Sequence, residues 1–245
     1  ENLNLIINNL NLSMKKIFKT MMLFTAALTA VSCGEKEQKQ TEFDYNVESF
    51  ADIQILRYKV DGFDELSLKQ KTFIYYLNEA ALWGRDILFD QNGRYNLEIR
   101  RMLEDFYQNY KGDREDKNFK GVEEYLKRVW FSNGIHHHYG SDKFVPKFER
   151  QWFVEQTKCS EEIAEVIFNP EVMAKKISLA EGVDLLLASA CNYYQGVTQE
   201  EAEAFYAEMK AKGDQAKPVM YGMNSTLVKG KDGKYPFEVG IAPLP

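Results

Sequence analysis

Three consecutive histidines, His136–His138, come nearest to a reactive site in this chain, and they are all the histidines it contains. In an extended segment, His136 and His138 would point to one side and His137 to the other. Two imidazoles on one side can begin a metal site. A catalytic zinc needs three protein ligands in tetrahedral geometry, and no H-E-x-x-H motif is present to supply the set. We therefore expect no metal at these histidines.

Two other roles stay open for the histidines. They can be loop side chains held by hydrogen bonds, or they can line a ligand cleft. Other catalytic signatures fail: the chain has no phosphate-binding glycine loop, no dinucleotide fingerprint and no G-x-S-x-G turn. Adjacent carboxylates such as Glu123 and Glu124 are typical of solvated helix faces. The residues alone predict no catalytic group.

Composition narrows the function classes. The chain has 245 residues, of which 44% are hydrophobic and 28% charged, with a net charge of −6. This length allows one large or two modest domains with a proper core. We do not expect nucleic-acid binding from an acidic chain, because such binding needs a surplus of Lys and Arg gathered on one face.

The hydrophobic periodicity predicts a mainly helical body, and we expect its apolar stripes to form the core. Capping boxes mark two helix starts, at Ser67 with Gln70 and at Thr198 with Glu201. Asn96 is expected to cap another helix. The predicted helices run from Leu68 toward Phe89, Asn96 to Tyr110 with Gly112 ending it, Phe119 to Trp130, Arg150 to Thr157, Ser160 to Phe168, and Thr198 to Met209 with Gly213 ending it.

The pattern changes near the end of the chain. Thr226–Lys229 and Lys234–Val239 flank Asp232-Gly233, which is typical of a tight hairpin turn. A lone hairpin is marginal in water, so we expect further strands beside it. Leu185–Ala190 is an apolar run that fits either a helix or a buried strand. The expected fold class is α+β.

The first residues are typical of an export signal. Residues 1–13 are interpreted as a non-native upstream extension, and residues 14–32 as a signal peptide with a lysine-rich start and a short apolar stretch. Small residues precede Cys33, as in the lipobox of bacterial lipoproteins; an ordinary signal peptide is the alternative. Residues 33–46 are polar and predict a tether, which leaves residues 47–245 as the folded part.

Two cysteines remain beyond that leader, Cys159 and Cys191. An oxidising compartment would permit a bridge between them. Neither lies in a C-x-x-C motif, and we expect both to be unpaired.

Five stretches resemble the bacterial branch of the dipeptidyl peptidase III family, a group of zinc-dependent enzymes that remove dipeptides from the N-termini of oligopeptides. The resemblance extends from about Phe50 to about Val239. The stretches are Phe50–Tyr58, Gly84–Gln91, Asn133–Gly140, Lys143–Pro146 and Ser189–Thr198.

The resemblance implies a two-lobed fold around a wide cleft. This chain is similar to the mainly helical start of the lower lobe, whose final hairpin would enter a small β-barrel. The family's zinc ligands lie in HExxGH and EExxxE-type motifs, and neither motif is present here. The loop before Pro146 would face the cleft, where Tyr139, with His136 and His138 beside it, would bind short peptides.

The expected function is therefore that of an N-terminal fragment of such a zinc enzyme, inactive alone because its zinc site is absent. The alternative is a non-enzymatic, lipid-anchored peptide-binding or interaction module derived from the same lobe. In either case we expect the chain in a bacterial cell envelope, held to the membrane by a lipid on Cys33 and facing the periplasm or the surface.

Overall fold

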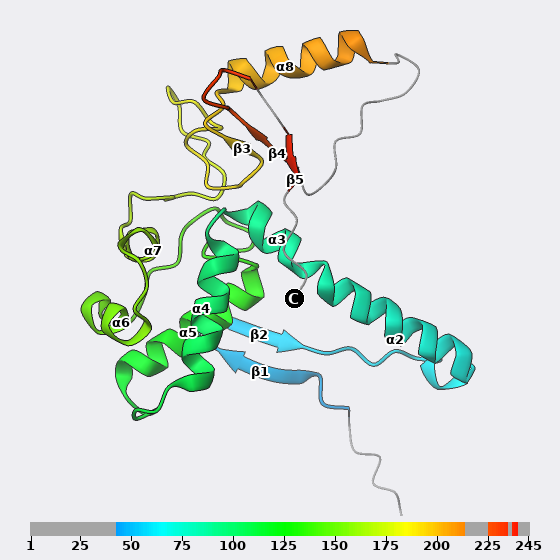
Figure 1. The fold of residues 1–245 in the computed structure, drawn as a ribbon. Coiled ribbons are helices and arrows are strands. Elements are labelled where there is room, and N and C mark those ends of the chain that lie inside the picture. The colour runs from blue at the N-terminus through cyan, green and yellow to red at the C-terminus, as the bar shows by residue number, and fades with distance from the viewer. Residues whose placement is uncertain (1–42, 214–224, 235–236, 240–245) are drawn as a thin grey trace, which may run out of the picture. The chain divides into compact units, whose positions relative to one another are not determined.

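The computed structural model describes residues 43–213, 225–234 and 237–239, and it shows a mixture of helices and short strands (Figure 1). The α+β class is confirmed at this level. The predicted signal peptide, Cys33 and most of the tether lie outside the described residues. No helix in the described ranges is long and apolar enough to cross a membrane.

The described chain divides into two compact units. Among the described residues, the smaller consists of residues 43–48 together with Gln54–Lys59. In it, Arg57 donates its backbone N–H to Tyr45 O at 2.9 Å and its Nε–H to Asp44 O at 2.7 Å. Strands β1 (Asn46–Phe50) and β2 (Ile53–Leu56) form a two-stranded sheet, which the sequence analysis did not predict.

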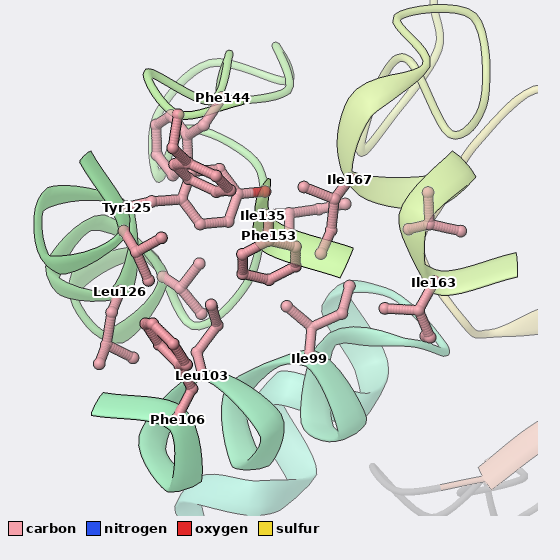
Figure 2. Close-up of a cluster of buried hydrophobic side chains, with 14 of the residues drawn as sticks. Ile99, Leu103, Phe106, Tyr125, Leu126, Ile135, Phe144, Phe153, Ile163 and Ile167 are labelled. Atoms are coloured by element: carbon pink, nitrogen blue, oxygen red, sulfur yellow. The ribbon is translucent and has the colours of Figure 1, made fainter. Parts of the chain in front are cut away.

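The larger unit has a helical core (Figure 2). Apolar residues of α4 (Asn96–Asn109) and α5 (Lys117–Ser132) form its centre, and the shorter helices α6 (Arg150–Thr157) and α7 (Glu161–Phe168) contribute Phe153 and Ile167. Tyr110, which was also predicted in the core, is only partly buried, whereas seven of the predicted core positions on α4 and α5 are confirmed. They are Ile99, Leu103, Phe106, Phe119, Val122, Leu126 and Val129, each at most 7% exposed.

Some details of the predicted core helices are wrong. Tyr95 occupies the N-cap position of α4 without a side-chain capping bond, while the side chain of Asn96 is buried inside the fold and accepts a hydrogen bond from the backbone N–H of Ile135. The helix ends at Asn109, ahead of Gly112. Trp130 is 38% exposed, and its indole N–H reaches outward to Glu104. For Asn96 and Trp130, side-chain contacts with other segments, and not the local sequence pattern, determine where the side chain lies.

The first predicted helix differs most from expectation. It begins with the predicted Ser67 capping box, but Gly84 divides it into α2 (Leu68–Trp83) and α3 (Arg85–Asn92). None of the α2 side chains is buried within the described structure, and Leu68 is 81% exposed. The expected core stripe on α2 is therefore wrong. The apolar residues of α2 itself lie on all sides of the helix, so their spacing defines no inward face.

The last described elements form a small sheet. Strand β3 (Tyr194–Gln195) lies parallel to β4 (Ser225–Val228), which pairs antiparallel with β5 (Phe237–Val239). Between β3 and β4 lies α8 (Gln199–Lys212), with its predicted capping box and Gly213 at its end. The predicted hairpin is confirmed, with Gly233 at φ 74° in the turn. A barrel is not shown.

Two further expectations are decided by the structure. Leu185–Ala190 forms a turn rather than the predicted helix or strand, and Asp184 Oδ1 accepts the N–H groups of Leu186 and Leu187 there. Cys159 and Cys191 are both free thiols, as predicted. A short 3-10 helix, η1 (Phe63–Glu65), precedes α2.

Candidate functional site

The histidines lie in a hairpin that follows α5, which we call the histidine hairpin (residues 135–144). Asn133, in the left-handed conformation at φ 51°, ends the helix. The two arms are joined by His137 N–H to Asp142 O at 2.8 Å and by Phe144 N–H to Ile135 O at 2.9 Å. The backbone of this loop is therefore fixed on both sides of its tip.

Two more segments extend this hairpin into a ladder of backbone hydrogen bonds. Lys176 donates its N–H to Ser141 O at 2.8 Å, and Cys191 donates its N–H to Lys176 O at 3.1 Å. Beside Cys191, Asn192 donates its N–H to Gln91 O at 2.8 Å. Parts of four stretches that carry the family resemblance thus meet: residues 84–91, 133–140, 143–146 and 189–198.

His136 is buried, with 2% of its surface exposed. Its Nε2–H donates to Met173 O at 2.7 Å, which ties the hairpin to the segment after α7. Burial lowers the pKa of His136 to about 4, although the Met173 carbonyl favours the charged form. His136 therefore holds the hairpin as a neutral imidazole.

The pKa of His136 predicts a pH-dependent stability. The ordinary pKa of a histidine is 6.5, so between pH 6.5 and pH 4 the imidazole of His136 is mostly protonated in the unfolded chain and mostly neutral in the folded chain. Lowering the pH from 7 to 5 should reduce the free energy of unfolding by about 2 kcal/mol through this group alone. Urea unfolding at both pH values measures the loss.

The matched variants for this prediction are His136→Gln and His137→Gln. Glutamine at position 136 can still donate to Met173 O but does not titrate, so this variant should lose the contribution, whereas His137→Gln should keep it. An NMR titration in which the His136 imidazole protonates near pH 6.5 in the folded chain would contradict the prediction.

His137 and His138 do not point to opposite sides, as they would in an extended segment. Their rings stack at 4.4 Å with an interplanar angle of 26°. His137 Nδ1 accepts the backbone N–H groups of Tyr139 and Gly140, which closes the tip of the hairpin. His138 meets the ring of Phe131 edge-on at 4.8 Å. The turn at the tip, rather than strand alternation, sets these directions.

Tyr139 is the most exposed part of the hairpin. Its side chain is 93% exposed, although its backbone is held by His137. Below the tip, a hollow of about 480 Å³ runs along the second arm. The ion pair of Asp142 with Lys175 lies on its wall. Its apolar lining includes Phe144, Val145, Pro146, Ile167, Phe168 and Pro170.

Lys143 has a role that the sequence patterns did not identify. Its ammonium group donates to three carbonyl oxygens at the C-terminal end of α7 and just beyond it: Val166 O at 3.0 Å, Asn169 O, and Val172 O at 2.7 Å. Burial lowers the pKa of Lys143, and the charges of Glu165 and Glu171 oppose this shift. Lys143 therefore fastens the second arm of the hairpin to α7.

The described residues offer no site for the zinc ion that the family resemblance associates with the full-length enzyme. No three side chains of His, Cys, Asp or Glu gather there in a way that could hold a metal ion. In addition, the Nε2 atom of His136 is already bonded to Met173 O. The described part of the chain does not fit a zinc ion, and no reaction step is derived through one.

Asn96 is a second residue whose importance the sequence did not reveal. Its buried side chain lies between Gly93 and Gly134, and its Oδ1 receives the N–H of Ile135 at the start of the hairpin. An asparagine in this position looks like a simple helix cap in the sequence. Its hydrogen bond comes from a residue 39 positions away.

Comparisons with known proteins add no family to these observations. No protein-family model matches the chain, and no curated protein matches it either.

Proposed function

We propose that this chain binds short peptides at the histidine hairpin, as the lower lobe of a dipeptidyl peptidase III-like enzyme would. The observation that carries the proposal is Tyr139, an almost fully exposed aromatic ring on a backbone fixed from both sides. An aromatic ring supplies a large contact area and few rotatable bonds, which suits a site for peptides of varied sequence.

The surroundings of Tyr139 support peptide binding. Val145, on the same hairpin, is 83% exposed, and the hollow beside it is lined mainly by apolar side chains. An apolar hollow whose lining begins at Asp142, three residues after the ring, can take one side chain of a peptide while the ring packs on another. Because the ladder already fixes this backbone, binding orders little of the protein.

Hydrolysis is a separate part of the proposal and rests on the resemblance. In the family, zinc supplies the activated water and polarises the peptide carbonyl. The described residues of this chain would bind and orient the peptide, and the zinc ligands would come from another part of the enzyme. A non-enzymatic peptide-binding module is the second candidate, and it uses the same surface.

Anchoring to the membrane through Cys33, with the domain displayed in the cell envelope, is likewise proposed from the sequence. It would place the peptide site where oligopeptides enter the cell. Mass spectrometry of the chain made in a bacterial host would find a diacylglyceryl modification on Cys33.

Replacing Tyr139 with alanine tests the binding proposal. We expect Tyr139→Ala to weaken the affinity for pentapeptides of apolar and aromatic residues about tenfold, which corresponds to the loss of roughly 1.4 kcal/mol of ring contact. Isothermal titration with the full chain measures the dissociation constant. The control is Tyr58→Ala, which removes a tyrosine that is 77% exposed in the other unit.

Comparing the two variants distinguishes binding at a specific site from nonspecific binding to exposed tyrosines. The control should bind as the parent does. Equal weakening by both substitutions, or an unchanged affinity in Tyr139→Ala, would contradict the proposal.

A further inference from the structure

A second hollow lies where the C-terminal ends of α4 and α6 meet, and we call it the α4–α6 hollow. Its volume is about 570 Å³, and it shares no lining residue with the hollow of about 480 Å³ below the tip of the histidine hairpin. A cavity of this size can hold a small organic molecule. Its lining includes Asp105, Phe106, Asn109, Tyr110, Lys111 and Gly112.

One wall of the α4–α6 hollow is aromatic and held in place by packing. The rings of Phe106 and Tyr110 lie 5.1 Å apart, and the ring of Trp152 on α6 lies 5.9 and 6.0 Å from them. Phe119 on α5 stacks on Tyr110 at 4.8 Å with an interplanar angle of 20°. A Cβ atom at Gly112 would lie 2.3 Å from Tyr110 Oη, so the glycine leaves room for this ring. The wall therefore offers apolar contact area that needs little ordering on binding.

Two opposite charges line the same hollow and do not pair with each other. Asp105 is exposed on α4, and its Oδ1 accepts a hydrogen bond from Asn109 Nδ2 at 2.9 Å. Its Oδ2 has no donor, and the carboxylate no ion pair, among the described residues. Lys111 is exposed just beyond the helix, and within the described ranges it has no ion pair either. Both groups are therefore available to a ligand in the hollow.

The electrostatics of the helix ends indicate which charge of a ligand each group would take. The C-terminal end of a helix carries a partial negative charge, and two such ends, those of α4 and α6, border this hollow. Together with the Asp105 carboxylate they favour an ammonium group. Lys111 lies beyond the end of α4 and can donate to a carboxylate in a charge-assisted bond. The rings of Phe106 and Tyr110 suit an apolar or aromatic side chain.

From this arrangement we infer that the α4–α6 hollow binds a free amino acid with an aromatic or apolar side chain. Asp105 would accept from its ammonium group, Lys111 would donate to its carboxylate, and its side chain would pack on the rings of Phe106 and Tyr110. A pentapeptide does not fit this role, because its terminal charges lie up to about 17 Å apart in an extended chain. The inference goes beyond the proposed function and uses none of the residues of the histidine hairpin.

The test compares phenylalanine with N-acetylphenylalanine and phenylalaninamide, which lack the ammonium group and the carboxylate respectively, by isothermal titration with the full chain. The parent should bind phenylalanine about tenfold more tightly than either derivative. Asp105→Asn, which keeps an acceptor for Asn109, should lose the preference over N-acetylphenylalanine and keep the preference over phenylalaninamide. Lys111→Met should show the reverse.

Matched controls come from charged residues outside the lining. Glu98→Gln removes another exposed carboxylate of α4, and Lys69→Met removes an exposed lysine of α2. Both variants should keep both preferences of the parent. Circular dichroism of all four variants verifies that they fold as the parent does.

The outcomes separate this inference from peptide binding at the histidine hairpin. If the parent does not bind phenylalanine or binds all three compounds equally well, the amino-acid site is overturned and the hairpin proposal stands. Retention of both preferences in Asp105→Asn or in Lys111→Met would also overturn it. Tyr139→Ala should bind phenylalanine as the parent does. A weaker affinity in that variant would place the amino acid at the hairpin and overturn the assignment to the α4–α6 hollow.

Discussion

Replacing Lys143 with methionine is expected to lower the free energy of unfolding by about 3 kcal/mol. The methionine chain can fill the volume of the lysine stem, but it donates no hydrogen bond. The carbonyl groups of Val166, Asn169 and Val172 would then lose a shared donor at the end of α7. Since hydrogen bonds to charged groups contribute roughly 1.5–3 kcal/mol, the loss should be large. Chemical denaturation measures it.

Lys147→Met is the matched control for this prediction. Lys147 lies four positions further along the chain, is 63% exposed and pairs with Glu124 at 2.8 Å. Exposed ion pairs contribute at most about 1 kcal/mol, so this variant should remain near the stability of the parent. A loss below about 1 kcal/mol in Lys143→Met would show that the ammonium group does not fasten the hairpin to α7.

Gly134→Ala is expected to have a similarly large effect, again about 3 kcal/mol. Gly134 has φ 150°, a conformation that side chains rarely adopt, and a Cβ atom there would lie 2.3 Å from Asn96 Nδ2. The buried amide of Asn96 would have to move, and it would release the N–H of Ile135 at the start of the histidine hairpin. Thermal and urea unfolding both report this loss.

The same hairpin contains its own control. A Cβ atom at Gly140 would meet nothing closer than 3.5 Å, the distance to His137 Nδ1, which is ordinary contact. Gly140→Ala should therefore change the free energy of unfolding by less than about 0.5 kcal/mol. Equal effects at positions 134 and 140 would mean that the close packing of Asn96 is not what requires glycine.

Local patterns were sufficient to predict the helices of the core. Ile99, Leu103 and Phe106 repeat at helical spacing on α4 and are buried, and the capping boxes at Ser67 and Thr198 form as expected. These features depend only on residues within a few positions of one another. The same is true of the hairpin around Gly233.

Features that depend on distant segments could not be predicted. Strand β3 has two residues, and its pairing with β4 joins positions more than 30 residues apart. Nothing local shows that Lys143 reaches the end of α7 or that His136 bonds to Met173. The exposure of α2 could not be predicted either, because a helix that is apolar all round has no preferred inward side.

That the candidate site binds a peptide stays a prediction, but the structure shows that its residues differ in their surroundings. The sequence indicated His136, His138 and Tyr139 as neighbours of a peptide. In the structure Tyr139 is exposed, whereas His136 is buried and its hydrogen bond joins two segments of the chain. Residue type alone does not separate a ligand-facing histidine from one that holds a loop. The hydrogen-bond partners make that distinction.

Peptide binding at the histidine hairpin is tested most directly by finding which residues a bound peptide contacts. Backbone amide shifts of the isotopically labelled full chain, recorded while a pentapeptide of apolar and aromatic residues is added, give this location. We expect the largest changes on residues 137–146 and 175–177, around Tyr139 and the hollow along the second arm of the hairpin. Changes confined to other elements, such as the ends of α4 and α6, or no saturable change at all, would contradict it.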